Sequence, residues 1–339
     1  MTTSRSQSQD ASWRIFQGNG AAHSDWTLPE PPKWRPRRAS KERAECDPDR
    51  PQLSPAARIN GMAYQADDDI IRMVNAAIYL RRPLLVTGAP GTGKSTLVDA
   101  IAHELNLGEP LRWAVTSRST LHNGLYSYDA IGRLQSRDAS KDAKEPHDIG
   151  AFIELGPLGT AMLPSLSPRI LLIDEIDKAD MDLPNDLLNV LDEGRFNIPE
   201  LGRISEDTIT VRLHGGNGEV KIENGNVECF EFPIVILTSN GERDFPAPFL
   251  RRCLQLRMPD PLTNRERLEA IVTAHLDADT TSRSSDLIAS FMERASKGEI
   301  LATDQLLNAI QMVMGSYAMD EGDKENLKIS LTMGLGRKS

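Results

Sequence analysis

Short apolar runs alternate with amphipathic segments between about residue 58 and residue 259. Five runs are apolar enough for buried strands: PLLVTG, LRWAVT, RILLIDE, PIVILTSN and CLQLRM. The segment DDDIIRMVNAAIYL, residues 67–80, instead has helical spacing of its apolar positions, with acidic residues at its start. This alternation predicts an α/β fold in which helices cover a sheet.

The chain outside this region has two other patterns. Residues 1–57 are rich in Pro, Arg, Ser and Asp, yet they hold three of the four tryptophans, Trp13, Trp26 and Trp34. Because disordered segments usually lack aromatic residues, we interpret this leader as a largely irregular docking arm on a folded surface. The alternative is a flexible leader whose tryptophans make no contact with the folded part of the protein.

Residues 260–339 keep helical periodicity and predict a smaller helical domain. Within 58–259, two segments are less regular, at about 117–168 and 203–232. The second contains alternating apolar residues and Gly-Gly and Asn-Gly turn signals. We interpret both segments as insertions into the α/β domain.

Composition and charge narrow the function classes. The chain has 339 residues, 39% hydrophobic and 26% charged, with a net charge of −10. That charge disfavours duplex DNA as an obligate partner, although a local basic loop stays possible. The apolar runs are too short for a membrane span, and the polar N-terminal stretch lacks the apolar core of a signal peptide. We therefore expect a cytoplasmic protein without a membrane partner. The three cysteines are widely spaced and fit neither a set of disulfides nor a zinc site.

The stretch GAPGTGKST, residues 88–96, matches the pattern of a phosphate-binding loop. A predicted strand precedes it and a predicted helix follows, so backbone N–H groups and a helix N-terminus can face phosphates. This context makes a chance glycine-rich turn a poor explanation. Lys94 would reach the β and γ phosphates of ATP, and Ser95 would bind Mg²⁺. The candidate nucleotide-binding residues are Gly88, Pro90, Gly91, Thr92, Gly93, Lys94, Ser95 and Thr96.

Polar residues at the ends of two later strands supply what ATP hydrolysis needs. RILLIDE ends in Asp174, a candidate Mg²⁺ ligand, and Glu175, which can orient and polarise the attacking water. PIVILTSN ends in Asn240, which can position the same water. Without the phosphate loop, Asn240 would be interpreted as an ordinary strand-end turn.

Two arginines, Arg251 and Arg252, stand between apolar residues in FPAPFLRRCLQLRMP, residues 245–259. They either end a short helix, where cations offset the helix dipole, or contact a phosphate.

The order of these motifs resembles the AAA+ ATPases: Walker A, Walker B, sensor 1 and arginine finger. Residues 60–316 are similar to the MoxR branch in GPLG (156–159), in the insertion preceding Walker B, in NDLLNVLDEGRF (185–196) and in a hairpin before sensor 1. The leader resembles MoxR-type ATPases of bacterial conflict or defence clusters. The resemblance implies a five-stranded parallel sheet, a helical lid and a hexameric ring with ATP sites between subunits.

The resemblance also assigns roles to the arginines. It makes Arg252 the finger for a neighbour's γ-phosphate and Arg251 an accessory. The lid arginine called sensor 2 is missing, because LATDQLLNAI has Asp304 and Gln305 there, and Arg294 or Lys297 is the candidate substitute.

The leading hypothesis is an ATP-hydrolysing ring motor that remodels or assembles a protein partner or adaptor. One alternative is a nucleic-acid motor or restriction-type subunit, and another is an ATP-gated switch with little turnover. The acidic net charge favours a protein partner, and the presence of Glu175 favours turnover. The sequence does not identify the substrate, because the loops that would face a ring's pore lie in the insertions.

Overall fold

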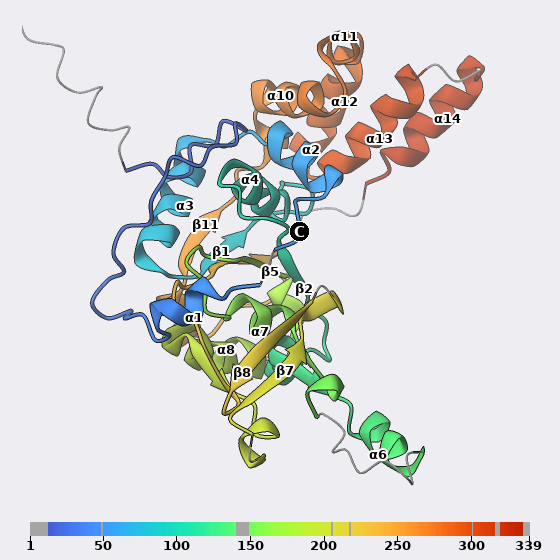
Figure 1. The fold of residues 1–339 in the computed structure, drawn as a ribbon. Helices are drawn as coiled ribbons and strands as arrows, with labels where there is room; N and C mark the ends of the chain where they lie inside the picture. The colour runs from blue at the N-terminus through green and yellow to red at the C-terminus, as the bar shows by residue number, and fades with distance from the viewer. Residues whose placement is uncertain are drawn as a thin grey trace, which may run out of the picture.

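The computed structural model describes residues 13–48, 50–139, 149–204, 206–216, 218–299, 301–315 and 319–334. At its centre is a five-stranded parallel sheet with strand order β11-β1-β10-β5-β2 (Figure 1). Its strands are β1 (Leu84–Thr87), β2 (Leu111–Ala114), β5 (Ile170–Asp174), β10 (Ile234–Ser239) and β11 (Leu254–Arg257). Each strand coincides with one of the five apolar runs, so the predicted α/β fold with a five-stranded parallel sheet is confirmed.

Side-chain alternation along the strands builds a hydrophobic core on each face of this sheet. Leu85, Leu171 and Ile173 belong to one buried cluster. Their neighbours Leu84 and Leu172 belong to the other. A sheet that is apolar on both faces needs helices on both faces.

The helices divide between these two cores. α3 (Asp68–Leu80) and α4 (Thr96–Glu104) cover one face, and α2 (Pro55–Ala63) packs on α4. α5 (Leu121–Leu125), α7 (Pro157–Ala161), α8 (Asp182–Glu193) and α9 (Ala247–Arg252) contribute to the other. α3 begins after Asp67, whose carboxylate accepts the Ile70 N–H, and ends at Arg81 in the left-handed conformation.

Both less regular segments contribute strands to a second sheet, of order β3-β4-β7-β8-β9-β6. Its strands are β3 (Tyr126–Tyr128), β4 (Ile153–Leu155), β6 (Arg195–Asn197), β7 (Thr208–Arg212), β8 (Glu219–Glu223) and β9 (Asn226–Glu228). β4 comes from the first segment and pairs in parallel with β7 from the second. α6 (Ala130–Ala139) projects away from the rest of the molecule in Figure 1. Short 3-10 turns span Ile149–Phe152, Ile176–Lys178, Leu201–Arg203, His214–Gly216 and Pro261–Thr263.

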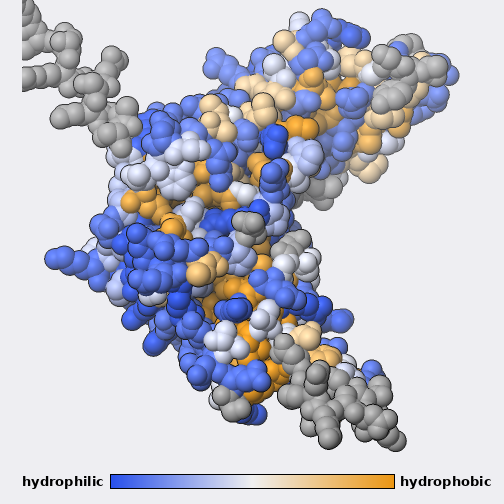
Figure 2. Space-filling view, in the orientation of Figure 1, coloured by the Kyte–Doolittle hydropathy of each residue, from blue (hydrophilic) through white to orange (hydrophobic). Residues whose placement is uncertain are grey.

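The C-terminal helices have a hydrophobic core of their own, which includes Leu268, Ile288 and Phe291. They are α10 (Arg265–His275), α11 (Ala278–Arg283), α12 (Ser285–Ser296), α13 (Thr303–Met314) and α14 (Glu321–Leu331). Figure 2 shows hydrophobic residues reaching the surface of this part between hydrophilic ones. In the described ranges, no helix has the length and apolar character needed to cross a membrane.

The leader runs along the outside of the molecule past α3 and continues to α1 (Lys41–Glu45) (Figure 1). Its first anchor is the buried side chain of Asn75 on α3. The Asn75 Oδ1 accepts the N–H groups of Ile15 (2.7 Å) and Phe16 (3.0 Å), and its Nδ2 donates to the Phe16 carbonyl (2.7 Å). Phe16 is fully buried, so its backbone and its ring are both fixed.

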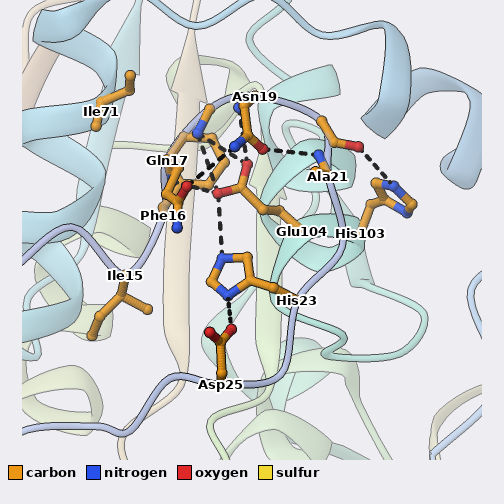
Figure 3. Close-up of polar contacts among 12 residues, drawn as sticks. Ile15, Phe16, Gln17, Asn19, Ala21, His23, Asp25, Ile71, His103 and Glu104 are labelled. Carbon is orange, nitrogen blue, oxygen red and sulfur yellow. Dashed lines mark hydrogen bonds and ion pairs between the residues drawn. The ribbon is translucent and has the colours of Figure 1, made fainter. Parts of the chain in front are cut away.

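The second anchor of the leader is Glu104 in the last turn of α4, which is only 1% exposed. Its carboxylate accepts consecutive backbone N–H groups from Gln17, Gly18 and Asn19 (Figure 3). Gly18 has a φ of +69°, a left-handed conformation that lets successive N–H groups converge on one anion. The buried charge is thereby compensated by the leader backbone. Trp34, in contrast, is 72% exposed and anchors nothing by burial.

We expect Phe16→Ala to lower the free energy of unfolding by about 3–5 kcal/mol, because it leaves a cavity where an aromatic ring is fully buried. Trp34→Ala in the same leader is the matched control and should change it by less than about 1 kcal/mol. Chemical denaturation of both variants measures the difference. Deletion of residues 1–40 should be at least as destabilising as Phe16→Ala. Equal, small effects of the two substitutions would contradict a docked leader.

Candidate functional site

Three neighbouring strands deliver the predicted polar residues to one edge of the sheet. β10 lies between β1 and β5, and Thr87 is in register with Ser239, as Leu237 is with Ile173. The loop after β1, Asn240 after β10 and the acidic end of β5 therefore meet at the carboxyl ends of adjacent parallel strands, where α/β folds place ligand sites.

The loop from Gly88 to Ser95 connects β1 to α4. Gly91 and Gly93 have φ values of +73° and +81°, which L-residues with side chains rarely adopt, so these positions favour glycine. The Thr92 hydroxyl donates to the Ala89 carbonyl (2.9 Å) and tightens the loop. Pro90 is exposed, and Thr96 is the first residue of α4.

Lys94 folds back across this loop and is only 8% exposed. Its ammonium group donates to the carbonyl oxygens of Gly88 (2.9 Å) and Ala89 (2.8 Å) and to the Asn240 Oδ1 (2.8 Å). Burial lowers the pKa of Lys94, while nearby acidic side chains act in the opposite direction. The cation therefore lies at the junction of the loop and the neighbouring strand.

Ser95 and Asp174 are in direct contact. The Ser95 side chain does not cap α4, and its hydroxyl donates instead to the Asp174 Oδ1 (2.9 Å). The Thr238 hydroxyl donates to the same oxygen (2.5 Å). Hydroxyl and carboxylate oxygens at this spacing are the hard ligands that Mg²⁺ prefers.

Glu175 directly follows β5 and has a left-handed backbone, with φ +58° and ψ +49°. A non-glycine residue in this region is strained, and such strain concentrates at functional sites. The Glu175 N–H donates to the Thr238 hydroxyl (2.9 Å), which holds this turn. Its carboxylate accepts from Lys178 Nζ (2.5 Å) and from Asn240 Nδ2 (3.4 Å).

Asn240 joins the cation and the acid of the site. Its amide oxygen accepts from Lys94, and its amide nitrogen donates to Glu175. Its own backbone N–H donates to the Asp177 Oδ2 (2.9 Å). A hydrogen-bonded chain thus connects the side chains of Lys94, Asn240 and Glu175.

Three further residues of this site were not identified from the sequence: Thr238, Asp177 and Lys178. Thr238 and Asp177 lie inside the motif stretches TSN and DEID. Their hydrogen-bond partners lie mainly at the ends of neighbouring strands. These partners can therefore be identified only once the order of the strands is known. Lys178 lies three residues after Glu175, and this spacing is a weak sequence signal for an ion pair between the two side chains.

Arg252 lies outside this network. Its Nε donates to the Asp192 carboxylate on α8, and one terminal nitrogen lies 3.4 Å from the Pro248 carbonyl. The Arg251 side chain makes no hydrogen bond or ion pair with any residue that the structure describes. The carbonyls of Arg251 and Arg252, which end α9, accept from Arg82. The helix end is thus capped by a different arginine, and Arg252 is partnered by a carboxylate.

The C-terminal helices approach the phosphate loop through the start of α13. A Cβ placed on Gly91 would lie 2.9 Å from the Thr303 nitrogen and 3.3 Å from the Asp304 carboxylate. The two candidates for the missing lid arginine, Arg294 and Lys297, form ion pairs with acidic residues of the same part of the chain. Arg294 pairs with Glu299 (2.6 Å) and Lys297 with Glu293 (2.7 Å).

A cavity of about 480 Å³ adjoins the loop at Ala89. Residues of the C-terminal part line most of it, including Leu262, Met292, Ala295 and Leu301. Its walls combine apolar side chains with Thr263 and Glu299, a mixture typical of small-molecule sites. Ala89 connects the cavity to the polar network, because its carbonyl accepts from Lys94.

The family model described as AAA domain (dynein-related subfamily) matches residues 83–252. This match covers 170 of the 339 residues, half of the chain, counted as 252 − 83 + 1. The chain therefore belongs to the AAA domain family, whose members generally hydrolyse ATP. The matched range contains the phosphate loop, Asp174, Glu175, Asn240 and both arginines.

One relative is the ATP-dependent protease ATP-binding subunit-like protein AmiB of Pseudomonas aeruginosa, which is 26% identical over 290 residues. That alignment covers 80% of this chain and 75% of AmiB. Among solved structures, NtrX from Brucella abortus in complex with ATP has a TM-score of 0.39 at 16% identity, over 73% of this chain. NtrX in complex with ADP has a TM-score of 0.40 at 14% identity, over 81% of this chain. This chain spans about half of those NtrX chains, 50% and 57%.

Proposed function

We propose that this protein is an ATP-hydrolysing AAA+ ring motor of MoxR type that remodels or assembles a protein partner. The observation that carries this proposal is the chain of side chains Lys94–Asn240–Glu175, beside the Ser95–Asp174 pair. A phosphate-binding cation, a water-orienting carboxylate and a pair of metal-ligating oxygens are the groups that phosphoryl transfer to water requires.

The residues present fit ATP and Mg²⁺. The loop has glycines where its backbone is left-handed, and the hydroxyl of Ser95 and carboxylate of Asp174 form a pair of oxygen donors. When bound, Mg²⁺ would neutralise charge on the phosphates, held by Ser95 and Asp174. The cavity at Ala89 is large enough for a nucleoside, and we assign it to the base and sugar.

Each polar side chain then has one task. The Lys94 ammonium group donates hydrogen bonds to phosphate oxygens in place of its present acceptors, the loop carbonyls. Glu175 accepts a hydrogen bond from the attacking water, and its left-handed backbone directs the carboxylate away from β5. Asn240 keeps Glu175 oriented by donating a hydrogen bond from its amide nitrogen. Its amide oxygen continues to accept a hydrogen bond from Lys94.

The proposal includes a ring, hexameric by resemblance, with Arg252 serving the site of the neighbouring subunit and Arg251 an accessory. Two observations support this direction: Arg252 contacts no residue of its own phosphate loop, and its side chain is 45% exposed. A protein partner agrees with the name of AmiB, an ATP-dependent protease ATP-binding subunit-like protein. A role in defence stays a hypothesis that rests on the leader alone.

We expect no salt-sensitive DNA binding at physiological ionic strength. The sequence has only scattered pairs of arginines, such as Arg37-Arg38 and Arg81-Arg82. One arginine of each pair is engaged internally, since Arg37 and Arg81 both pair with the buried Glu231 (2.5 and 3.2 Å). A fluorescence anisotropy titration with duplex and single-stranded DNA tests this. ATPase rates measured with the same nucleic acids and with candidate protein partners form the second arm. Submicromolar affinity that falls steeply with salt, as counterion release requires, would establish the nucleic-acid alternative.

A further inference from the structure

The last turn of α8 holds an acidic side chain that the proposed mechanism does not use. Asp192 lies one residue before the final residue of α8, where the helix dipole disfavours a negative charge. Its two oxygens contact two different arginines. Oδ1 accepts from the Arg35 NH2 group (2.9 Å), and Oδ2 accepts from the Arg252 Nε. Asp192 therefore bridges the leader and the proposed finger.

Arg35 is the buried member of this bridge, at 6% exposed. Besides Asp192, its NH1 group donates to the carbonyls of Leu191 and Asp192, which are unpaired at the end of an α-helix. Its guanidinium also lies 5.4 Å from the Phe232 ring centre, within cation–π range. With these contacts Arg35 ties the leader, the C-terminal end of α8 and the Asp192 carboxylate into one unit.

Arg252 is held from one side only. Its Nε contacts Asp192 and its NH1 contacts the Pro248 carbonyl, whereas its NH2 has no partner in the described part of the chain. Arg82 fixes the backbone beneath it by donating to the Arg252 carbonyl (3.0 Å). These groups surround a shallow cavity of about 380 Å³, lined by Trp34, Arg35, Arg82, Asp192 and Arg252.

We propose that Asp192 and Arg35 are positioning residues for Arg252, through which the docked leader sets the direction of the finger. This inference rests on the proposed function, in which Arg252 meets a neighbour's phosphate. An arginine at a surface loses freedom of rotation when a carboxylate holds its guanidinium, and a buried arginine such as Arg35 holds that carboxylate in turn. The NH2 edge of Arg252 is the edge left for the phosphate.

Asp192→Ala should lower kcat about 10- to 100-fold, the effect of a small misplacement of a catalytic group, and leave the KM for ATP within about twofold. In an Arg252→Ala background the same substitution should cause no further loss, because its effect passes through Arg252. Asp186→Ala is the control, an exposed acidic residue of the same helix. Arg35→Lys, which keeps the charge without the fork, should give an intermediate loss.

The ATPase activity of mixed rings distinguishes a positioning role of Asp192 from a merely structural one. Asp192→Ala subunits keep an intact pocket, so adding Glu175→Gln subunits, which carry a well-held Arg252, should restore part of their activity. The proposal is overturned if Asp192→Ala lowers kcat equally in the presence and absence of Arg252, or if it behaves like Asp186→Ala. If Arg252→Ala itself leaves turnover unchanged, the proposed role of Arg252 fails first, and the positioning role fails with it.

Discussion

Glu175→Gln is expected to bind ATP as tightly as the wild-type protein and to hydrolyse it about 10²- to 10⁴-fold more slowly. The carboxylate acts on water during the reaction, while its ground-state contacts are with Lys178 and Asn240 rather than with the phosphate loop. Glutamine keeps the shape and loses the charge that makes the water nucleophilic. Steady-state ATPase rates together with equilibrium nucleotide titrations measure the two effects separately.

Lys94→Ala is the companion variant, and we expect it to lose affinity for ATP, which Glu175→Gln keeps. Hydrogen bonds to charged groups contribute about 1.5–3 kcal/mol each, so ATP affinity should fall about 10- to 150-fold. Lys41→Ala, on the exposed face of α1, and Asp180→Asn, close to Glu175 in the chain, are the matched controls. Equal loss of affinity in the Lys94 and Glu175 variants would show that the two roles have been assigned wrongly.

The sequence predicts the central sheet and the phosphate loop well because both depend on local patterns. A buried parallel strand is a short apolar run, and a glycine at a positive φ is required wherever the loop turns. Lys94, Asp174 and Asn240 each follow or end such a strand region, so their types and positions were sufficient to make them candidate site residues. Their meeting depends on the strand order, which the structure supplies.

Contacts between distant segments could not be predicted. The Thr238 hydroxyl donates a hydrogen bond to Asp174 and accepts one from the Glu175 N–H, but in the sequence Thr238 is one of several polar residues at the end of a strand. The leader illustrates the same limit more strongly. Its tryptophans pointed to a docked arm, and Trp13 and Trp26 do contact the folded part. The backbone around Phe16 and Gly18 also fixes the leader, and its partners on α3 and α4 could not be read from the sequence.

The sequence leaves two explanations for Arg251 and Arg252, a helix end or a phosphate contact, and the structure helps to choose between them. A cation in the last turn of a helix is explained by the helix dipole alone, so Arg251 and Arg252 carry no sequence signal that separates the two explanations. Arg82 takes the carbonyls that end α9, and Asp192 takes the Arg252 guanidinium. An exposed arginine held by a carboxylate across two helices is better explained as an oriented group than as a helix cap.

Mixing two inactive variants should therefore restore ATPase activity if Arg252 acts on a neighbouring subunit. Arg252→Ala subunits keep a complete pocket and donate no finger, whereas Glu175→Gln subunits lack turnover and still donate one. Each variant alone should be nearly inactive, since fingers in related phosphoryl-transfer systems contribute about 10³- to 10⁵-fold in rate. Mixed rings contain interfaces at which Arg252 of one subunit meets the working pocket of another.

The size of the recovery distinguishes the possible arrangements, provided that native mass spectrometry confirms mixed rings. An arginine that acts within its own subunit gives a large loss in Arg252→Ala and no recovery on mixing. Arginines that only stabilise a helix end give losses of a few-fold in either variant. Arg251→Ala should lose less than Arg252→Ala, because consecutive helical residues point about 100° apart and only one of them can face the same phosphate. Recovery on mixing, combined with this difference, assigns the finger to Arg252.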